Sequence, residues 1–194
     1  MTDPKPRPGR GRPRTITRER VADAGIALGL AQLSVVGVAA ALGVTQMALY
    51  KRVGGLEELR SLVAEEAFLR WPLPAPEEDA DLEAYLHRFS LSLWRLVHRH
   101  AGIAPYLLRR DWITDAMLRH TQEHQARVAE CFGLTAAQSS RLVFTVAYHC
   151  CAIADTSRSE APSEAPDGEK IEPLHEFGLK ALIAGAIALS GDDG

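Results

Sequence analysis

The stretch "SVVGVAAALGVTQMALYKRVGG", residues 34–55, holds two short apolar runs separated by a glycine. Ser34 and Thr45 are residue types that cap the N-terminus of a helix, and Gly43 is the type that ends one. Apolar residues recur within each run at the spacing of one helical face. The pattern therefore predicts one helix from Ser34, a tight turn at Gly43, and a second helix from Thr45 to about Arg52.

Two helices this short cannot be stable alone, so they must pack on the helices before and after them. A pair of helices joined by a three-residue turn is a helix-turn-helix, whose second helix lies in the major groove of DNA. An ordinary helical hairpin has the same spacing, and the pattern alone leaves that alternative open. Amide side chains can pair with adenine, methionine can contact the thymine methyl group, and Lys, Arg and Tyr can bind phosphates. The predicted DNA contacts on this unit are Ser34, Thr45, Gln46, Met47, Tyr50, Lys51 and Arg52.

Residues 17–59, "TRERVADAGIALGLAQLSVVGVAAALGVTQMALYKRVGGLEEL", resemble the DNA-binding domain of the TetR family of bacterial transcriptional regulators. Residues 175–189, "HEFGLKALIAGAIAL", also resemble the last helix of many members. The resemblance implies a homodimer that binds a near-palindromic duplex operator as a repressor and is released by a small-molecule effector. Many members have His in place of Arg52, and a phosphate-binding Lys in place of Leu56. In this chain Arg52 or the amides of Gly54 and Gly55 would have to supply that contact.

The segment "RGRPR", residues 10–14, precedes this unit and resembles the core of an AT-hook. Narrow A·T-rich minor grooves attract inserted arginines, so we expect Arg10, Arg12 and Arg14 to bind there. Non-specific phosphate binding is the alternative. The formal net charge of the chain is −3, yet residues 1–60 are net positive. A basic head on an acidic body suggests that only the head meets a polyanion.

The rest of the chain predicts more helices. Three prolines in residues 71–80 predict a linker, and the polar residues 156–173 predict a mobile loop. No alternating strand pattern occurs, so the predicted fold class is all-α, with about nine helices. The further predicted helices are 56–69, 80–100, 102–109, 111–132, 135–155 and 173–190. The predicted domains are a flexible basic arm (1–15), a helix-turn-helix DNA-binding domain of three helices (16–60, its fourth helix continuing to about 70), and a helical effector-binding and dimerisation domain (71–194).

The predicted helices 135–155 and 173–190 are apolar on nearly every side, so they must be buried all round. Gly178 and Gly185 belong to a stripe of small residues that allows a close approach between helices. These two helices therefore predict a four-helix interface between two copies of the chain, although core helices of a monomer would show the same pattern.

The helix 111–132 carries Ile113, Met117, His120, His124, Val128 and Cys131 at spacings that place them on one inward face. His120 and His124 interrupt this stripe and could bind a polar ligand or a metal, or be ordinary core histidines. No third metal ligand is identifiable, so no metal site is predicted. Large aromatic side chains with few polar atoms often line ligand cavities. The predicted effector-binding residues are Trp94, His98, Tyr106, Trp112, Met117, His120, His124 and Tyr148.

The composition favours a cytoplasmic protein without a membrane segment. No secretory signal is visible, no apolar run approaches the length that spans a bilayer, and the three cysteines form no disulfide framework. An enzyme using a histidine with Asp111, Asp115 or Cys151 is the alternative class, but no catalytic or phosphate-binding motif supports it. We expect neither catalysis nor a cofactor. A DNA-binding regulator that responds to a protein partner instead of a small molecule remains the second reading.

Overall fold

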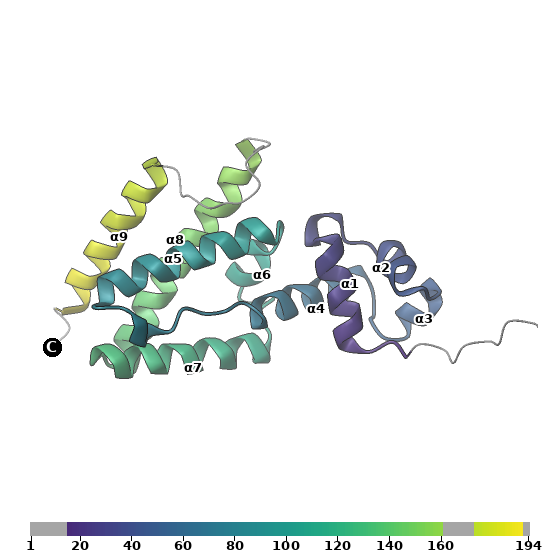
Figure 1. Ribbon diagram of the computed structural model, residues 1–194, viewed down its shortest axis with the longest axis horizontal. Helices are drawn as coiled ribbons and strands as arrows, with labels where there is room; N and C mark the ends of the chain where they lie inside the picture. The colour runs from purple at the N-terminus through teal and green to yellow at the C-terminus, as the bar shows by residue number, and fades with distance from the viewer. Residues whose placement is uncertain (1–14, 161–172, 192–194) are drawn as a thin grey trace, which may run out of the picture.

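The computed structural model describes residues 15–160 and 173–191, and every regular element within them is a helix (Figure 1). Nine α-helices and two short 3₁₀ turns make up this part of the chain, which confirms the predicted all-α class. The helices are α1 (Arg18–Leu28), α2 (Val35–Leu42), α3 (Gln46–Tyr50), α4 (Leu56–Leu69), α5 (Leu82–Arg99), α6 (Ala104–Leu108), α7 (Asp115–Phe132), α8 (Ala136–Glu160) and α9 (Pro173–Gly191), and the 3₁₀ turns are Leu30–Gln32 and Pro76–Glu78.

Helices α1, α2 and α3 form a small head at one end of the long axis (Figure 1). Their apolar faces meet around Val21, Val38 and Leu49, none of which is more than 2% exposed. Helix α4 packs along α1 and leads from the head into the body, where α5 to α9 form a bundle. The head is thus stabilised by α4, as expected for helices too short to be stable alone.

Helices α1 and α4 approach closely because Gly25 has no side chain. A Cβ atom at Gly25 would overlap a methyl group of Val63, which is 1% exposed. Ion pairs flank this contact on the surface: Arg18 Nη2 lies 2.6 Å from a Glu65 carboxylate oxygen, and Arg70 Nη1 lies 2.6 Å from Asp23. Surface pairs of this kind contribute about 0–1 kcal/mol each. The buried contact therefore does more than the ion pairs to hold the head on α4.

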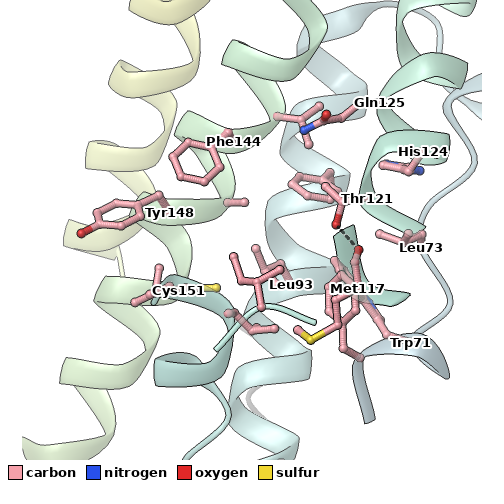
Figure 2. Close-up of a pocket in the computed structure, with 17 residues that line it drawn as sticks. Trp71, Leu73, Leu93, Met117, Thr121, His124, Gln125, Phe144, Tyr148 and Cys151 are labelled. Carbon is pink, nitrogen blue, oxygen red and sulfur yellow. Dashed lines mark hydrogen bonds between the residues drawn. The ribbon is translucent and has the colours of Figure 1, made fainter. Parts of the chain in front are cut away.

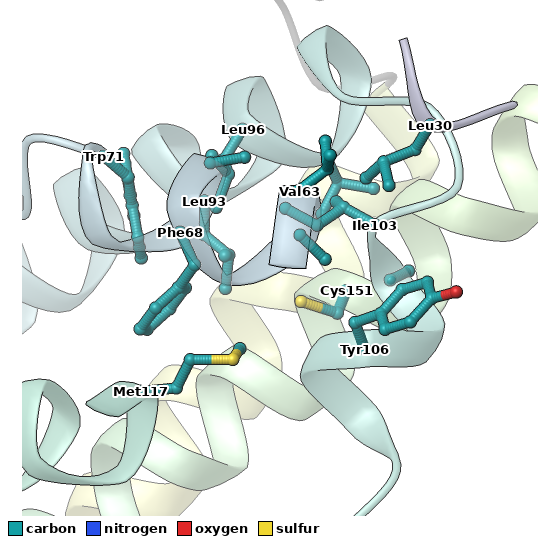
Figure 3. Packing of buried hydrophobic residues seen from close by; sticks show 14 of the residues in the cluster. Leu30, Val63, Phe68, Trp71, Leu93, Leu96, Ile103, Tyr106, Met117 and Cys151 are labelled. Carbon is teal, nitrogen blue, oxygen red and sulfur yellow. The ribbon is translucent and has the colours of Figure 1, made fainter. Parts of the chain in front are cut away.

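The apolar core continues from the head into the body (Figure 3). It runs from Leu30 past Val63 and Ile103 to Met117 and Cys151, all 5% exposed or less. Helix α5 packs mainly on α8, which also contacts α7 and α9. The boundary near residues 60–70 therefore cuts through one hydrophobic core, and the predicted division into domains stays a prediction.

Several predicted boundaries shift. Helix α3 ends at Tyr50 instead of Arg52, and α7 begins at Asp115, where Thr114 accepts a hydrogen bond from Met117 N. Helix α8 runs on to Glu160, so residues 156–160 are helical and the loop prediction is wrong for them. The remainder of that predicted loop, residues 161–172, lies outside the described residues.

The inward stripe of α7 departs from the predicted one at His120 and Cys131. Met117, His124 and Val128 are buried, whereas Cys131 is exposed, so its predicted inward position is wrong. The helical period of 3.6 residues carries the buried face from Met117 through Thr121 to His124, and His120 lies at its margin.

Helices α8 and α9 expose large apolar side chains: Phe144, Tyr148, Leu174, Phe177 and Leu189. Cβ atoms added at Gly178 or Gly185 would meet nothing, so the small-residue stripe faces outward in the single chain. Helix α9 is also long and apolar enough to cross a membrane by length and composition, with only 17% of that window buried. The expectation that no segment reaches this length is therefore wrong for α9 by that measure. Helices that pack into a protein interface have the same properties.

Candidate DNA-binding surface and effector pocket

The turn between α2 and α3 has the geometry of a helix-turn-helix. Gly43 adopts the left-handed conformation (φ 67°, ψ 36°) that a side chain disfavours. The N–H of Val44 donates to Ala39 O, which satisfies a carbonyl at the end of α2. Ser34 Oγ accepts from Gly37 N, and Thr45 Oγ1 accepts from Ala48 N, so both predicted N-caps are present. Leu49 is fully buried and fixes which side of α3 faces outward.

The outward side of α3 carries the predicted DNA-contacting side chains. Met47 is 68% exposed and Tyr50 is 48% exposed, so both side chains are accessible to a partner. Thr45, Gln46, Lys51 and Arg52 are exposed beside them, while Ser34 is half-buried as the cap of α2. The structure thus brings the predicted set on 45–52 together on one surface, and Ser34 lies apart at the start of α2.

The first described residues lie beside this same surface. Ile16, directly before α1, shares a shallow depression with Thr45, Met47, Lys51 and Arg52. Arg10, Arg12 and Arg14 lie outside the described residues. Because the chain enters the head beside α3, an arm that precedes Ile16 starts next to the exposed face of α3.

The amide of Gly54 cannot supply the phosphate contact that the sequence suggested for it. Its N–H donates to Glu58 Oε2 at 2.6 Å, so it is already used, and a carboxylate occupies the place of an anion. Gly55 has no such partner among the described residues and takes φ 153° at the start of α4. Arg52 and the Gly55 amide therefore remain the candidates for that contact.

A cavity of about 110 Å³ opens between α5, α7 and α8, with the end of α4 and residues of α6 completing its wall (Figure 2). Its lining is almost wholly apolar, and aromatic rings stand on several sides. Trp71 and Phe89 have ring centroids 5.8 Å apart, and Trp71 is held by a hydrogen bond from its Nε1 to Ser92 Oγ at 2.8 Å. On α8, the rings of Phe144 and Tyr148 lie tilted to each other with centroids 6.0 Å apart, and both side chains are about half exposed.

The polar side chains of α7 that line the cavity are those of Thr121, His124 and Gln125. The Thr121 hydroxyl donates to Met117 O at 2.9 Å. Nε2 of His124 shares a hydrogen bond with the Tyr85 hydroxyl at 2.5 Å. Burial lowers the pKa of His124 to about 4 and raises the pKa of Tyr85, so both are neutral at pH 7.

The predicted effector residues divide into two groups. Met117, His124 and Tyr148 line the cavity. The others do not, because their side chains are taken up elsewhere: Trp94 stacks on His98 at 4.5 Å beneath α9, and Tyr106 packs on Trp112 at 4.8 Å. His120 lies edge-on to Phe68 at 5.8 Å, and its buried Nε2 has no hydrogen-bond partner within the described part of the chain. The residues placed outside the cavity are Trp94, His98, Tyr106, Trp112 and His120.

Sequence reasoning missed several cavity residues. Phe68 and Trp71 fall where the sequence suggested a helix end and a linker, yet both are nearly buried. Thr121 and Gln125 are one turn apart on the buried side of α7, a spacing that could have identified them. Among the described residues no group of three or more His, Cys, Asp or Glu could hold a metal ion. Burial also raises the pKa of the Cys151 thiol, which is unfavourable for a nucleophile.

Comparison with known proteins finds the fold in solved structures only. No protein-family model and no curated protein matches the chain. ActR from Streptomyces coelicolor superposes with a TM-score of 0.71 at 19% identity, over 92% of this chain and 98% of that one. The chain has the TetR fold. A TetR variant from Acinetobacter baumannii, solved with minocycline, gives a TM-score of 0.66 at 23% identity over 92% and 97% of the two chains. ActR is also known in complex with actinorhodin (TM-score 0.70, 20% identity, covering 92% of this chain and all of that one). The TetR fold confirms, at the level of architecture, the resemblance seen in residues 17–59.

Proposed function

We propose that the chain is a dimeric transcriptional repressor of the TetR family that binds a near-palindromic operator and is released by a small molecule. The observation that carries the proposal is the exposed side of α3. Gln46, Met47, Tyr50 and Lys51 project from a helix whose opposite side is fixed by buried Leu49. This arrangement suits a helix that enters the major groove and contacts base edges.

The proposed dimer pairs α8 and α9 of two copies. The exposed Leu174, Phe177 and Leu189, together with the outward small-residue stripe of α9, would be covered in a four-helix interface. Two heads presented in this way can reach successive major grooves of one duplex, which explains the expectation of a near-palindromic site.

The proposed release passes through α4. Phe68 and Trp71 lie in the wall of the cavity, while Val63, on the same helix, packs against Gly25 of the head. A ligand that prefers one position of α4 therefore also prefers one position of the head. Because the coupling is reciprocal, the ligand changes the free energy of DNA binding by the difference between its own binding free energies for the two positions. Such a coupling is typically about 1–3 kcal/mol. The ligand-bound ActR and TetR structures support a small molecule in this role.

The experiment that tests the DNA-binding proposal is selection of duplexes from a random library at low salt, followed by titration of the selected and scrambled sequences. Arg52→Ala should weaken binding and reduce the slope of log affinity against log salt by about 0.9. Arg119→Ala removes another exposed arginine, from α7, and is the matched control, for which no change is expected. A wild-type protein that binds selected and scrambled duplexes equally would overturn the proposal.

A regulator that answers to a protein partner is the second candidate, favoured by the exposed apolar residues of α8 and α9. The cavity favours the small-molecule reading. If the purified protein is monomeric with those side chains free, the partner reading gains support.

A further inference from the structure

The residues that line the cavity indicate the chemical class of the molecule that binds there. That this molecule controls DNA binding rests on the proposed function. No Asp, Glu, Lys or Arg belongs to the described lining. An ion would therefore enter without a partner, and an unpaired charge in apolar surroundings is strongly disfavoured.

The shape of the wall favours a flat ring. Trp71 and Phe89 stand together at a ring-plane angle of 40°, and Phe144 and Tyr148 stand on α8 (Figure 2). Aromatic rings prefer offset or edge contacts with other rings at such positions. The volume of about 110 Å³ is on the scale of a cavity that holds benzene, roughly 150 Å³. The half-exposed Phe144 and Tyr148 leave room for a second ring at the rim.

The polar edge of the ligand can meet hydrogen-bonding groups on α7. Thr121 and Gln125 lie one turn apart on α7 and project toward the cavity (Figure 2). Because the Thr121 proton is used on Met117 O, its oxygen can only accept a hydrogen bond from a ligand. The Gln125 side-chain amide has no hydrogen-bond partner within residues 15–160 and 173–191, so it can both accept and donate.

We propose that the cavity binds an uncharged, planar aromatic molecule of one or two fused rings that carries a single hydrogen-bond donor on its edge, as a phenol does. The rings pack between Trp71 and the α8 aromatics, and the donor meets Thr121 and Gln125.

The test is isothermal titration calorimetry of the full chain at pH 7 with three naphthalenes of matched size. The probes are 2-naphthol, 2-methoxynaphthalene, which lacks the donor, and 2-naphthoate, which is charged. We expect 2-naphthol to bind about tenfold or more tightly than 2-naphthoate because of the charge. Loss of the donor should weaken binding by about two- to tenfold. Equal or tighter binding of 2-naphthoate, or no binding of any probe, would overturn the proposal.

Two variants locate the site. Thr121→Val keeps the side-chain volume and should reduce the preference for 2-naphthol over its methyl ether. Gln125→Lys introduces a positive charge and should make 2-naphthoate the preferred probe, a gain that mere misfolding cannot produce. If both variants keep the wild-type order of affinity for the three probes, the probes bind elsewhere and the assignment of this cavity is wrong.

Failure of this inference differs from failure of the proposed function. Titrations of the selected duplex with each probe present report DNA release separately from probe binding. If the protein binds DNA specifically but prefers 2-naphthoate, the proposed function holds and the proposed ligand class is wrong. If it binds 2-naphthol tightly but no duplex specifically, the ligand class holds and the proposed function is wrong.

Discussion

The hydroxyl of Tyr85 lies 2.5 Å from Nε2 of His124, and this pair joins α5 to α7 inside the body. Tyr85 is fully buried and His124 is 5% exposed. The His124 ring also stacks on Phe89 at 5.9 Å, within the wall of the cavity. A hydrogen bond between two neutral groups thus sits directly behind the proposed ligand site.

The first prediction concerns acid stability. Burial lowers the pKa of folded His124 to about 4, below its ordinary value of 6.5. The unfolded chain therefore binds the proton first as pH falls, and stability decreases between about pH 6.5 and 4 and not above that window. The loss from this residue is at most about 3 kcal/mol. Urea unfolding of the wild type and His124→Gln at several pH values measures it.

The Gln variant keeps a hydrogen-bonding group near the position of Nε2 but does not titrate in this range. Its stability should therefore fall less steeply than that of the wild type over the same window. Burial also lowers the pKa of His100, which contributes in the same direction in both proteins. Parallel curves for the two proteins would show that His124 is not the acid-sensitive group.

The second prediction concerns the contact of head and α4. Gly25→Ala places a methyl group against Val63, a side chain whose β-branching leaves few other rotamers. The overlap should cost about 1–3 kcal/mol, partly offset by about 1 kcal/mol of helix propensity. Thermal unfolding measures the net loss. Ala27→Gly on the exposed side of α1 gives the propensity term alone, and a stabilised Gly25→Ala protein would contradict the close approach.

The third prediction concerns base reading. Gln46→Ala should cost about 1–3 kcal/mol on the selected operator and relax the preference at one base pair. Competition against operators altered at single positions measures it. An equal loss on operator and scrambled DNA would mean that Gln46 contacts only the backbone.

The fourth prediction concerns the start of α4. Glu58→Ala frees the Gly54 amide and removes a carboxylate, so affinity for any duplex should rise by roughly three- to tenfold at low salt. Glu57→Ala removes the same charge one residue away, where Glu57 pairs with Arg60 at 2.7 Å. Fluorescence anisotropy compares them, and an identical rise in both variants would mean that only the net charge matters.

The fifth prediction concerns the proposed dimer. Phe177 on α9 is 73% exposed in the single chain, so Phe177→Glu should place a charge in the α8–α9 interface and dissociate it. Leu118→Glu, on the exposed side of α7, is the control. Sedimentation velocity measures whether each protein is a monomer or a dimer. A Phe177→Glu protein that remains dimeric would exclude α9 from the interface.

Local signals in the sequence were enough for the head. Ser34, Gly43 and Thr45 act through their own backbone, so the caps and the turn could be predicted without any knowledge of the fold. The buried face of α7 was predicted correctly at Met117, His124 and Val128. It was wrong in having His120 and Cys131 in place of Thr121 and Phe132, because apolar character alone does not mark a face that includes polar residues.

The cavity could not be predicted in the same way. Its wall combines Phe68 and Trp71 with residues more than seventy positions later, and only tertiary packing brings them together. Trp94 and Tyr106 are equally aromatic but pack against His98 and Trp112 instead. Residue type therefore indicated a ligand-sized aromatic region, and the neighbours of each ring decided which ones face the cavity.

The apolar core that includes both Leu30 and Ile103 at the junction of head and body has a thermodynamic consequence. Two units that share one interior cannot melt independently, since exposing either leaves apolar surface of the other in water. Scanning calorimetry should therefore record a single cooperative heat-absorption peak for the whole chain, with ligand and DNA each shifting that same peak.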